Sequence, residues 1–149
     1  TWYDVPTEEF AFVANLRQDP ELQEYGTVIQ EDGLELFSVD SMMDKRKFEV
    51  RDKYAAFMWG NSGYVKIKSG HNLNHQDGKT SRLLLFKDSY ANSIIPYLTH
   101  NYDEIIVVDL RYATKSVKEL MQEEFDDIFV MYNFSTYVSS ASDLAKLKF

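Results

Sequence analysis

Four apolar residues, Leu83-Leu84-Leu85-Phe86, lead directly into the polar group Lys87-Asp88-Ser89-Tyr90. Two similar apolar runs follow, Ile105-Ile106-Val107-Val108 and Ile128-Phe129-Val130-Met131. Short, continuous apolar runs are typical of parallel strands covered on both faces. Residues 90–98 and 116–122 lie between them and are expected to form helices. The sequence therefore predicts a β-α-β-α-β array, and the expected fold class is α/β, three-layer, with a mainly parallel sheet and flanking helices.

The segments before and after this array carry weaker signals. Residues 53–59 and 64–68 are expected to be strands, residues 69–81 a polar surface loop, and residues 139–147 a closing helix. Short apolar segments at 28–29 and 34–37 flank Asp32-Gly33, which favours a hairpin. We expect a single domain over residues 1–149, with an irregular and hairpin part at 1–51 and the β-α-β-α-β core at 52–149.

The composition excludes several classes of function. A net charge of −8 repels phosphate backbones and anionic lipid headgroups, so nucleic acid is not an expected partner. No apolar run approaches the roughly 18 residues of a membrane span, and we expect no membrane-spanning segment within the chain. The absence of cysteine excludes disulfides, thiolate metal sites and thiol nucleophiles. Because the chain begins at Thr1 with no leader-like segment, we interpret it as a processed product or a fragment.

Ser89 is the candidate nucleophile. Ligands of open parallel sheets gather at the carboxyl ends of the strands, where helix amino termini present unpaired N–H groups. A hydroxyl there could attack an ester carbonyl, while nearby amides stabilise the oxyanion. The alternative is that Asp88 or Ser89 only caps the following helix. Gly60-Asn61 also follows a predicted strand, and is either a source of a second oxyanion donor or a plain turn.

The motifs resemble those of the bacterial DHHW family, which is similar to SGNH hydrolases and to alginate-type O-acetyltransferases. The resemblance covers roughly residues 52–132. It rests on three segments, which are residues 52–61, the run Lys87-Asp88-Ser89-Tyr90-Ala91-Asn92 followed by Pro96, and Asp109-Leu110-Arg111-Tyr112.

This resemblance implies an SGNH- or flavodoxin-like fold that is incomplete at its amino terminus. It makes Ser89 the nucleophile and assigns Gly60 and Asn61 as oxyanion donors. The chain departs from the SGNH pattern in two places, with Trp59-Gly60-Asn61-Ser62 where Gly-Gly-Asn-His is usual and Lys87 where a glycine is usual. The Asp-His-His-Trp motif that would supply the base is absent and is expected upstream.

No local histidine is a convincing substitute for that base. His100 follows the helix that starts at Ser89, which at about 1.5 Å per residue places it roughly 13 Å away. His71 and His75 lie in the polar loop, and with Asp77 they are interpreted as solvated side chains, not a metal site. Asp109 and Arg111 follow the next strand, where they form either a structural ion pair or, like Asp88, part of the site edge. We expect no metal and no cofactor.

The leading hypothesis is an SGNH-like serine esterase or O-acyltransferase that acts on a polysaccharide or small acyl ester. The resemblance implies a bacterial, extracytoplasmic or cell-surface location. Without a base, the chain by itself is expected to be inactive. The alternative is a non-catalytic module that binds a glycan or a protein. A third reading is anion or nucleotide binding at the helix start beside Lys87.

Overall fold

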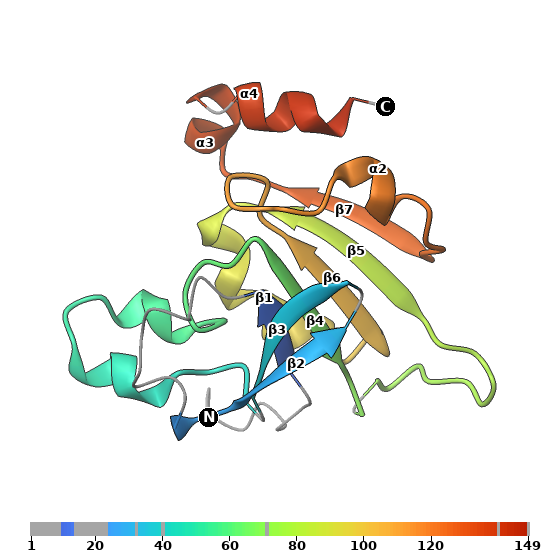
Figure 1. Ribbon diagram of the computed structural model, residues 1–149, viewed down its shortest axis with the longest axis horizontal. Helices are drawn as coiled ribbons and strands as arrows, with labels where there is room; N and C mark the ends of the chain where they lie inside the picture. The colour runs from blue at the N-terminus through green and yellow to red at the C-terminus, as the bar shows by residue number, and fades with distance from the viewer. Residues whose placement is uncertain are drawn as a thin grey trace.

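The computed structural model describes residues 10–13, 24–31, 33–39, 41–70, 72–139 and 141–148. Its centre is a seven-stranded sheet in the order β2-β3-β1-β4-β6-β5-β7 (Figure 1). The strands are β1 (Phe10–Val13), β2 (Thr27–Glu31), β3 (Leu34–Val39), β4 (Tyr64–Lys68), β5 (Arg82–Lys87), β6 (Glu104–Val108) and β7 (Asp127–Met131). The sheet therefore crosses the boundary expected between residues 1–51 and 52–149.

The expected fold class is wrong. Only the β5–β6 and β5–β7 pairs are parallel, whereas β1–β3, β1–β4, β2–β3 and β4–β6 are antiparallel. The sheet is thus mixed and not mainly parallel. The apolar runs correctly identified three strands that run in one direction. They carried no information on β4, which lies beside β6 with the opposite direction, because burial of both faces does not depend on strand direction.

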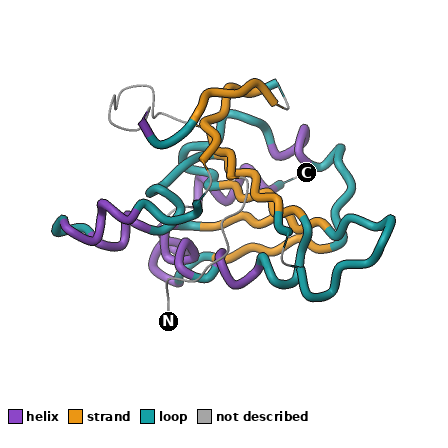
Figure 2. Tube along the Cα trace, turned by 90° about the horizontal axis from the view of Figure 1, so that it is seen from below, coloured by secondary structure: helices purple, strands orange, loops and turns teal. Residues whose placement is uncertain are grey.

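The helices are short and do not form two covering layers. The α-helices are α1 (Ile95–Leu98), α2 (Val117–Leu120), α3 (Phe134–Ser139) and α4 (Ala141–Leu144). Within the described ranges, the 3₁₀ segments are η3 (Lys45–Glu49), η4 (Lys53–Ala56), η5 (Ser89–Ser93) and η6 (Ala145–Leu147). Figure 2 shows these segments as short pieces beside the strands. The helix expected at 90–98 is η5 followed by α1. The closing helix expected at 139–147 corresponds to α4 and η6, and a separate helix, α3, precedes it.

Local predictions in the first half had mixed outcomes. The hairpin is confirmed, since β2 and β3 pair in antiparallel register and Gly33 adopts a φ of 72° at the turn. Asp32 lies outside the described residues. The strand at 64–68 is confirmed as β4. The strand expected at 53–59 is wrong, because residues 53–56 form η4 and only Phe57 makes an isolated bridge, to Met43.

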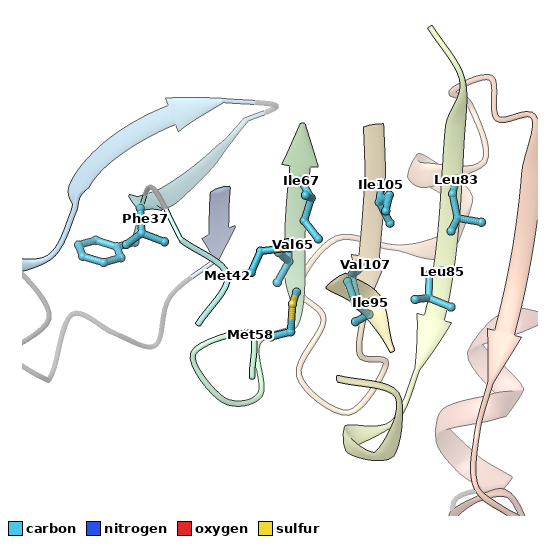
Figure 3. Packing of buried hydrophobic residues seen from close by; sticks show 11 residues of the cluster. Phe37, Met42, Met58, Val65, Ile67, Leu83, Leu85, Ile95, Ile105 and Val107 are labelled. Carbon is cyan, nitrogen blue, oxygen red and sulfur yellow. The ribbon is translucent and has the colours of Figure 1, made fainter. Parts of the chain in front are cut away.

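The core occupies both faces of the central strands. On β5 and β6, alternate side chains enter two separate clusters, as the two-residue period of a strand requires. Leu83, Leu85, Ile105 and Val107 join Ile95 of α1 on one face (Figure 3). Leu84, Phe86, Ile106 and Val108 join Val117 and Leu120 of α2 on the other. The centre of the sheet is therefore buried on both faces, and Ser89 follows β5 at the carboxyl end of this buried region.

Within the described residues, no helix has the length and apolar character needed to cross a bilayer.

Candidate functional site

Ser89 lies at the junction where β5 ends and η5 begins. The N-cap of η5 is Asp88, which is 1% exposed. Its Oδ1 accepts a hydrogen bond from the N–H of Tyr90 at 3.0 Å, and its Oδ2 accepts one from the N–H of Asn133 at 2.9 Å. Asp88 therefore performs the capping role that the sequence left open between two residues.

The Ser89 hydroxyl is not used by the fold. The side chain is half-buried, and its Oγ has no hydrogen-bond partner among the residues that the structure describes. Its backbone N–H stands at the first position of η5, where a helix offers no internal acceptor. Ser89 thus combines a free hydroxyl and an adjacent N–H at the carboxyl edge of β5.

The loop that carries Gly60 and Asn61 has an unusual backbone. Met58 and Trp59 have φ values of 57° and 55°, and Gly60 follows with 92°. Left-handed conformations of bulky residues cost energy and persist only where the surroundings enforce them. Here the N–H of Met58 donates to Met42 O at 2.9 Å, and Nε1 of Trp59 donates to Ser41 O at 2.7 Å. These contacts hold the loop in a strained form next to Asn61.

The two predicted oxyanion donors differ in availability. The N–H of Gly60 donates to the carbonyl of Phe57 at 3.1 Å, so it is already occupied. Asn61 is exposed, and its Oδ1 accepts a hydrogen bond from Nδ2 of Asn92 at 3.2 Å. Its own Nδ2 is left to donate elsewhere. Their roles as oxyanion donors stay predictions.

A buried polar network underlies the Ser89 turn. Lys87 and Asn92 are each 1% exposed, and Asp109 is 0% exposed. The ammonium of Lys87 donates to Oδ1 of Asn92 at 2.7 Å and lies 3.6 Å from Oδ2 of Asp109. Burial lowers the pKa of Lys87 to about 8, against the opposing attraction of Asp109. Because this ammonium is enclosed and paired, it offers little to an external anion, which removes the support for anion binding beside Lys87.

Asp109 and Arg111 form the ion pair that the sequence offered as one alternative. Nε and Nη2 of Arg111 donate to the two carboxylate oxygens of Asp109 at 2.9 and 2.6 Å, a bidentate geometry. This pair fixes Asp109 beneath Lys87. Whether Asp88, Asp109 and Arg111 line a substrate site stays a prediction.

The described histidines lie at the other end of the sheet. Nδ1 of His75 is 2.8 Å from Oδ1 of Asp103, immediately before β6, and the carbonyl of His100 accepts from the N–H of Leu73. The 69–81 loop is seen at the end of β5 opposite to η5 (Figure 1). The six residues of β5 span roughly 20 Å at about 3.3 Å each. His100 and His75 are therefore remote from Ser89, and His71 lies outside the described residues.

His75, in the polar loop, has a structural partner in Asp103. Burial opposes ionisation of Asp103, but hydrogen bonds from Ser81, Asn72 and His75 outweigh it and lower the pKa of Asp103 to about 2. Among the residues described, no group of three His, Cys, Asp or Glu side chains could hold a metal ion.

Solved structures with the same fold have been found for this chain. A DHHW family protein from Eubacterium siraeum matches with a TM-score of 0.58 and 20% identity, over 94% of this chain and 40% of that one. The chain shares the fold of a DHHW family protein. Bacillus cereus PatB1 is also similar. Its structure with a sulfonyl adduct gives a TM-score of 0.59 at 18% identity, over 89% of this chain and 38% of that one. A second PatB1 structure gives 0.60 at 17% identity, over 89% and 37%.

The likeness to the DHHW protein confirms, at the level of fold, the resemblance that the motifs indicated. The chain spans about two-fifths of the length of these neighbours, between 37% and 40%. No family model and no curated protein matches the chain.

Sequence reasoning did not single out Asn92 or Tyr132. Asn92 belongs to the motif that carries the DHHW resemblance, but its contact with Asn61 links residues 31 positions apart. Tyr132 follows β7, and its buried hydroxyl has no hydrogen-bond partner among the described residues. Burial and the negative charge of Asp109 raise the pKa of Tyr132 to about 12. For Asn92, the only signal in the sequence was its position, because it is a polar residue three positions after the candidate nucleophile Ser89.

Proposed function

We propose that this chain is the nucleophile-bearing part of an SGNH-like serine esterase or O-acyltransferase. Its substrate is an acyl ester of a bacterial envelope polysaccharide, on the extracytoplasmic side of the cell. The observation that carries the proposal is the free hydroxyl of Ser89 at the end of a buried strand, with the capping role taken by Asp88. The compartment and the polysaccharide come from the DHHW resemblance.

The proposed chemistry is acyl transfer in two steps. The Oγ of Ser89 attacks the ester carbonyl, and its proton passes to a general base. The developing oxyanion receives hydrogen bonds from Nδ2 of Asn61 and from the N–H of Ser89. The tetrahedral intermediate then collapses: the bond to the alcohol oxygen breaks, and the base returns the proton to the departing alcohol, which leaves an acyl-serine. Water or a sugar hydroxyl attacks this acyl group and gives its proton to the base. The acyl–Oγ bond breaks, and the proton passes back to Oγ, which releases Ser89.

The general base comes from residues outside the described part of the chain. His75 and His100 lie at the far end of β5, too distant for the direct hydrogen bond of about 3 Å that a base requires. The neighbours with this fold are longer than the chain, which leaves room for such a residue. The sulfonyl adduct of Bacillus cereus PatB1 supports the proposal, because sulfonyl reagents combine with activated nucleophiles.

Hydrolysis of p-nitrophenyl acetate tests this proposal. The assay compares the 149-residue chain with a version extended upstream to include an Asp-His-His-Trp segment. We expect turnover about 10² to 10⁴ times faster in the extended protein, because general-base catalysis contributes that factor. Ser89→Ala abolishes it, and Ser142→Ala, at an exposed position, leaves it unchanged. Strong Ser89-dependent turnover by the 149-residue chain would show that the base lies within it.

The second candidate is a non-catalytic module that binds a glycan. It is favoured by two exposed rings on the helical segment that begins at Ser89, Tyr90 at 68% and Tyr97 at 52% exposure, because aromatic faces stack on sugar rings. An extended protein that retains a polysaccharide on a column but has no Ser89-dependent esterase activity would support this candidate. Loss of retention on Tyr90→Ala, with Tyr137→Ala as the matched exposed control, would place the binding surface.

A further inference from the structure

Three elements meet at the side chain of Asn92. Its Oδ1 accepts from Nζ of Lys87, at the end of β5, over 2.7 Å. Its Nδ2 donates to Gly60 O over 3.3 Å and to Oδ1 of Asn61 over 3.2 Å. Asn92 therefore links the end of β5 to the strained loop that carries Asn61.

The chemistry of these groups allows one orientation of each amide. The ammonium of Lys87 has donors only, so it must face the oxygen of Asn92. The carbonyl of Gly60 can only accept, so it must face the nitrogen of Asn92. The contacts with Lys87 and with Gly60 therefore indicate the same orientation of the Asn92 amide. The nitrogen of Asn92 then requires an acceptor from Asn61, which turns Oδ1 of Asn61 inward and its Nδ2 outward.

Asn61 reaches η5 through Asn92, and η5 also carries Ser89. In a 3₁₀ helix, residues three apart eclipse each other, and Ser89 and Asn92 are the first and fourth residues of η5. At about 2.0 Å of rise per residue, they are separated by roughly 6 Å along the axis. An acyl group bound at Ser89 is therefore within reach of a donor held by Asn92.

We propose that Lys87 and Asn92 are positioning residues that orient the amide of Asn61, so that its N–H and not its oxygen faces the substrate. This inference rests on the proposed function of Ser89 and Asn61. Neither positioning residue touches the substrate, since both are 1% exposed. Asp109 contributes to this arrangement because it balances the buried charge of Lys87, and its bidentate pair with Arg111 holds Asp109 in place.

Asn92→Asp is the decisive variant. A carboxylate is nearly isosteric and keeps the contact with Lys87, but it also loses the hydrogen bond to Gly60 O, so thermal unfolding is measured beside activity. The carboxylate cannot donate to Oδ1 of Asn61, so the amide of Asn61 reverses and presents its oxygen to the substrate. In the extended protein we expect kcat to fall by about 10² to 10³, as for loss of an oxyanion donor, with KM little changed. Asn61→Ala should cause a fall of the same size, and the exposed Asn101→Ala should cause none.

A double variant separates positioning from a merely structural role. If Asn92 acts through Asn61, Asn61→Ala combined with Asn92→Asp is no slower than Asn61→Ala alone. Multiplied losses would overturn the proposal, because they would mean that the two residues act independently.

The side-chain amide signals of Asn61 provide a test that does not depend on catalysis. In ¹⁵N-labelled 149-residue chain, we expect them to move in Asn92→Asp and in Lys87→Met and to stay in place in Asn101→Ala. If the Asn61 signals stay unchanged in Asn92→Asp, Asn92 does not orient Asn61, and the proposal is overturned irrespective of the activity measured. Asn92→Asp alone is sufficient for this test if Lys87→Met fails to fold. If Ser89→Ala keeps full activity, the proposed function fails, while the amide signals still decide whether Lys87 and Asn92 orient Asn61.

Discussion

At the scale of single residues, the turn at 87–89 divides three tasks among three adjacent side chains. Lys87 enters the buried network, and Asp88 caps η5 and binds the backbone after β7. The hydroxyl of Ser89 makes no hydrogen bond to the part of the chain that the structure describes. The sequence assigned capping to either Asp88 or Ser89. The two alternatives differ in which substitution destabilises the fold.

Asp88→Ala should lower the free energy of unfolding by about 1 to 3 kcal/mol, because it leaves the N–H groups of Tyr90 and Asn133 without their acceptor in a buried place. Ser89→Ala should change it by no more than about 0.5 kcal/mol. Urea denaturation of both variants measures the difference. A larger loss for Ser89→Ala than for Asp88→Ala would mean that the cap has been assigned to the wrong residue.

Lys87 should make stability depend on pH above neutrality. Burial lowers the pKa of Lys87 to about 8 from 10.5, so the unfolded chain binds more protons than the folded one between these values. The free energy of unfolding should therefore gain a contribution on the order of 3 kcal/mol as pH rises from about 8 to about 10.5. The measurement is urea denaturation at several pH values, as the difference between wild type and Lys87→Met. A wild-type curve parallel to that of Lys87→Met would contradict the burial of this charge.

At the scale of elements, the loop at residues 57–61 shows that a buried apolar segment can form a turn instead of a strand. The sequence predicted a strand at 53–59 from its apolar side chains, but the structure uses Met58 and Trp59 to anchor a tight left-handed turn. Apolar composition reports burial, and a buried residue can be part of a loop as well as of a strand.

Gly60→Ala should destabilise the chain by about 1 kcal/mol through backbone conformation alone, because a φ of 92° disfavours any side chain while no atom lies within 4 Å of the added Cβ. Gly33→Ala is the matched control, with a φ of 72° and equally open space. Thermal unfolding should show similar losses for both. In the extended protein only Gly60→Ala should reduce esterase activity, since only Gly60 positions Asn61; equal reductions would argue against a specific role of this loop.

At the scale of the whole molecule, one edge of the sheet stands out. β7 is an edge strand, and its Ile128, Phe129 and Val130 are 46%, 37% and 53% exposed. The apolar sequence of β7 predicts a strand buried on both faces, but β7 is largely exposed, whereas β5 is buried from Leu83 to Lys87. An exposed apolar edge is a site of strand pairing between molecules.

The 149-residue chain should therefore self-associate at high concentration, and Val130→Lys should reduce this, because charge on an edge strand opposes pairing. Leu73→Lys, in the 69–81 loop and 83% exposed, is the matched control. Sedimentation velocity measures the distribution of species. Equal association of the wild type and Val130→Lys would show that the β7 edge is not the contact.

The strands that the sequence located best are those with the strongest local pattern. β5, β6 and β7 correspond to the three apolar runs, and β4 and the β2–β3 hairpin correspond to alternation and to the turn around Gly33. The candidate nucleophile was found for the same reason, since the change from apolar to polar residues after Phe86 marks the end of a strand. The fold class was missed because strand direction is not encoded in such patterns.

By itself, the sequence located β2 to β7, although it did not find β1 and wrongly placed a strand at 53–59, and it showed that Ser89 begins a helical turn at the end of β5. These properties depend on the periodicity and hydrogen-bonding groups of adjacent residues. Only the tertiary structure decided that β4 runs against β6, that Lys87 is buried, and that Asn92 contacts Asn61 across 31 residues of chain. Sheet pairing, desolvation of a charge and the orientation of an amide all arise from groups that are distant in sequence and meet only when the chain has folded.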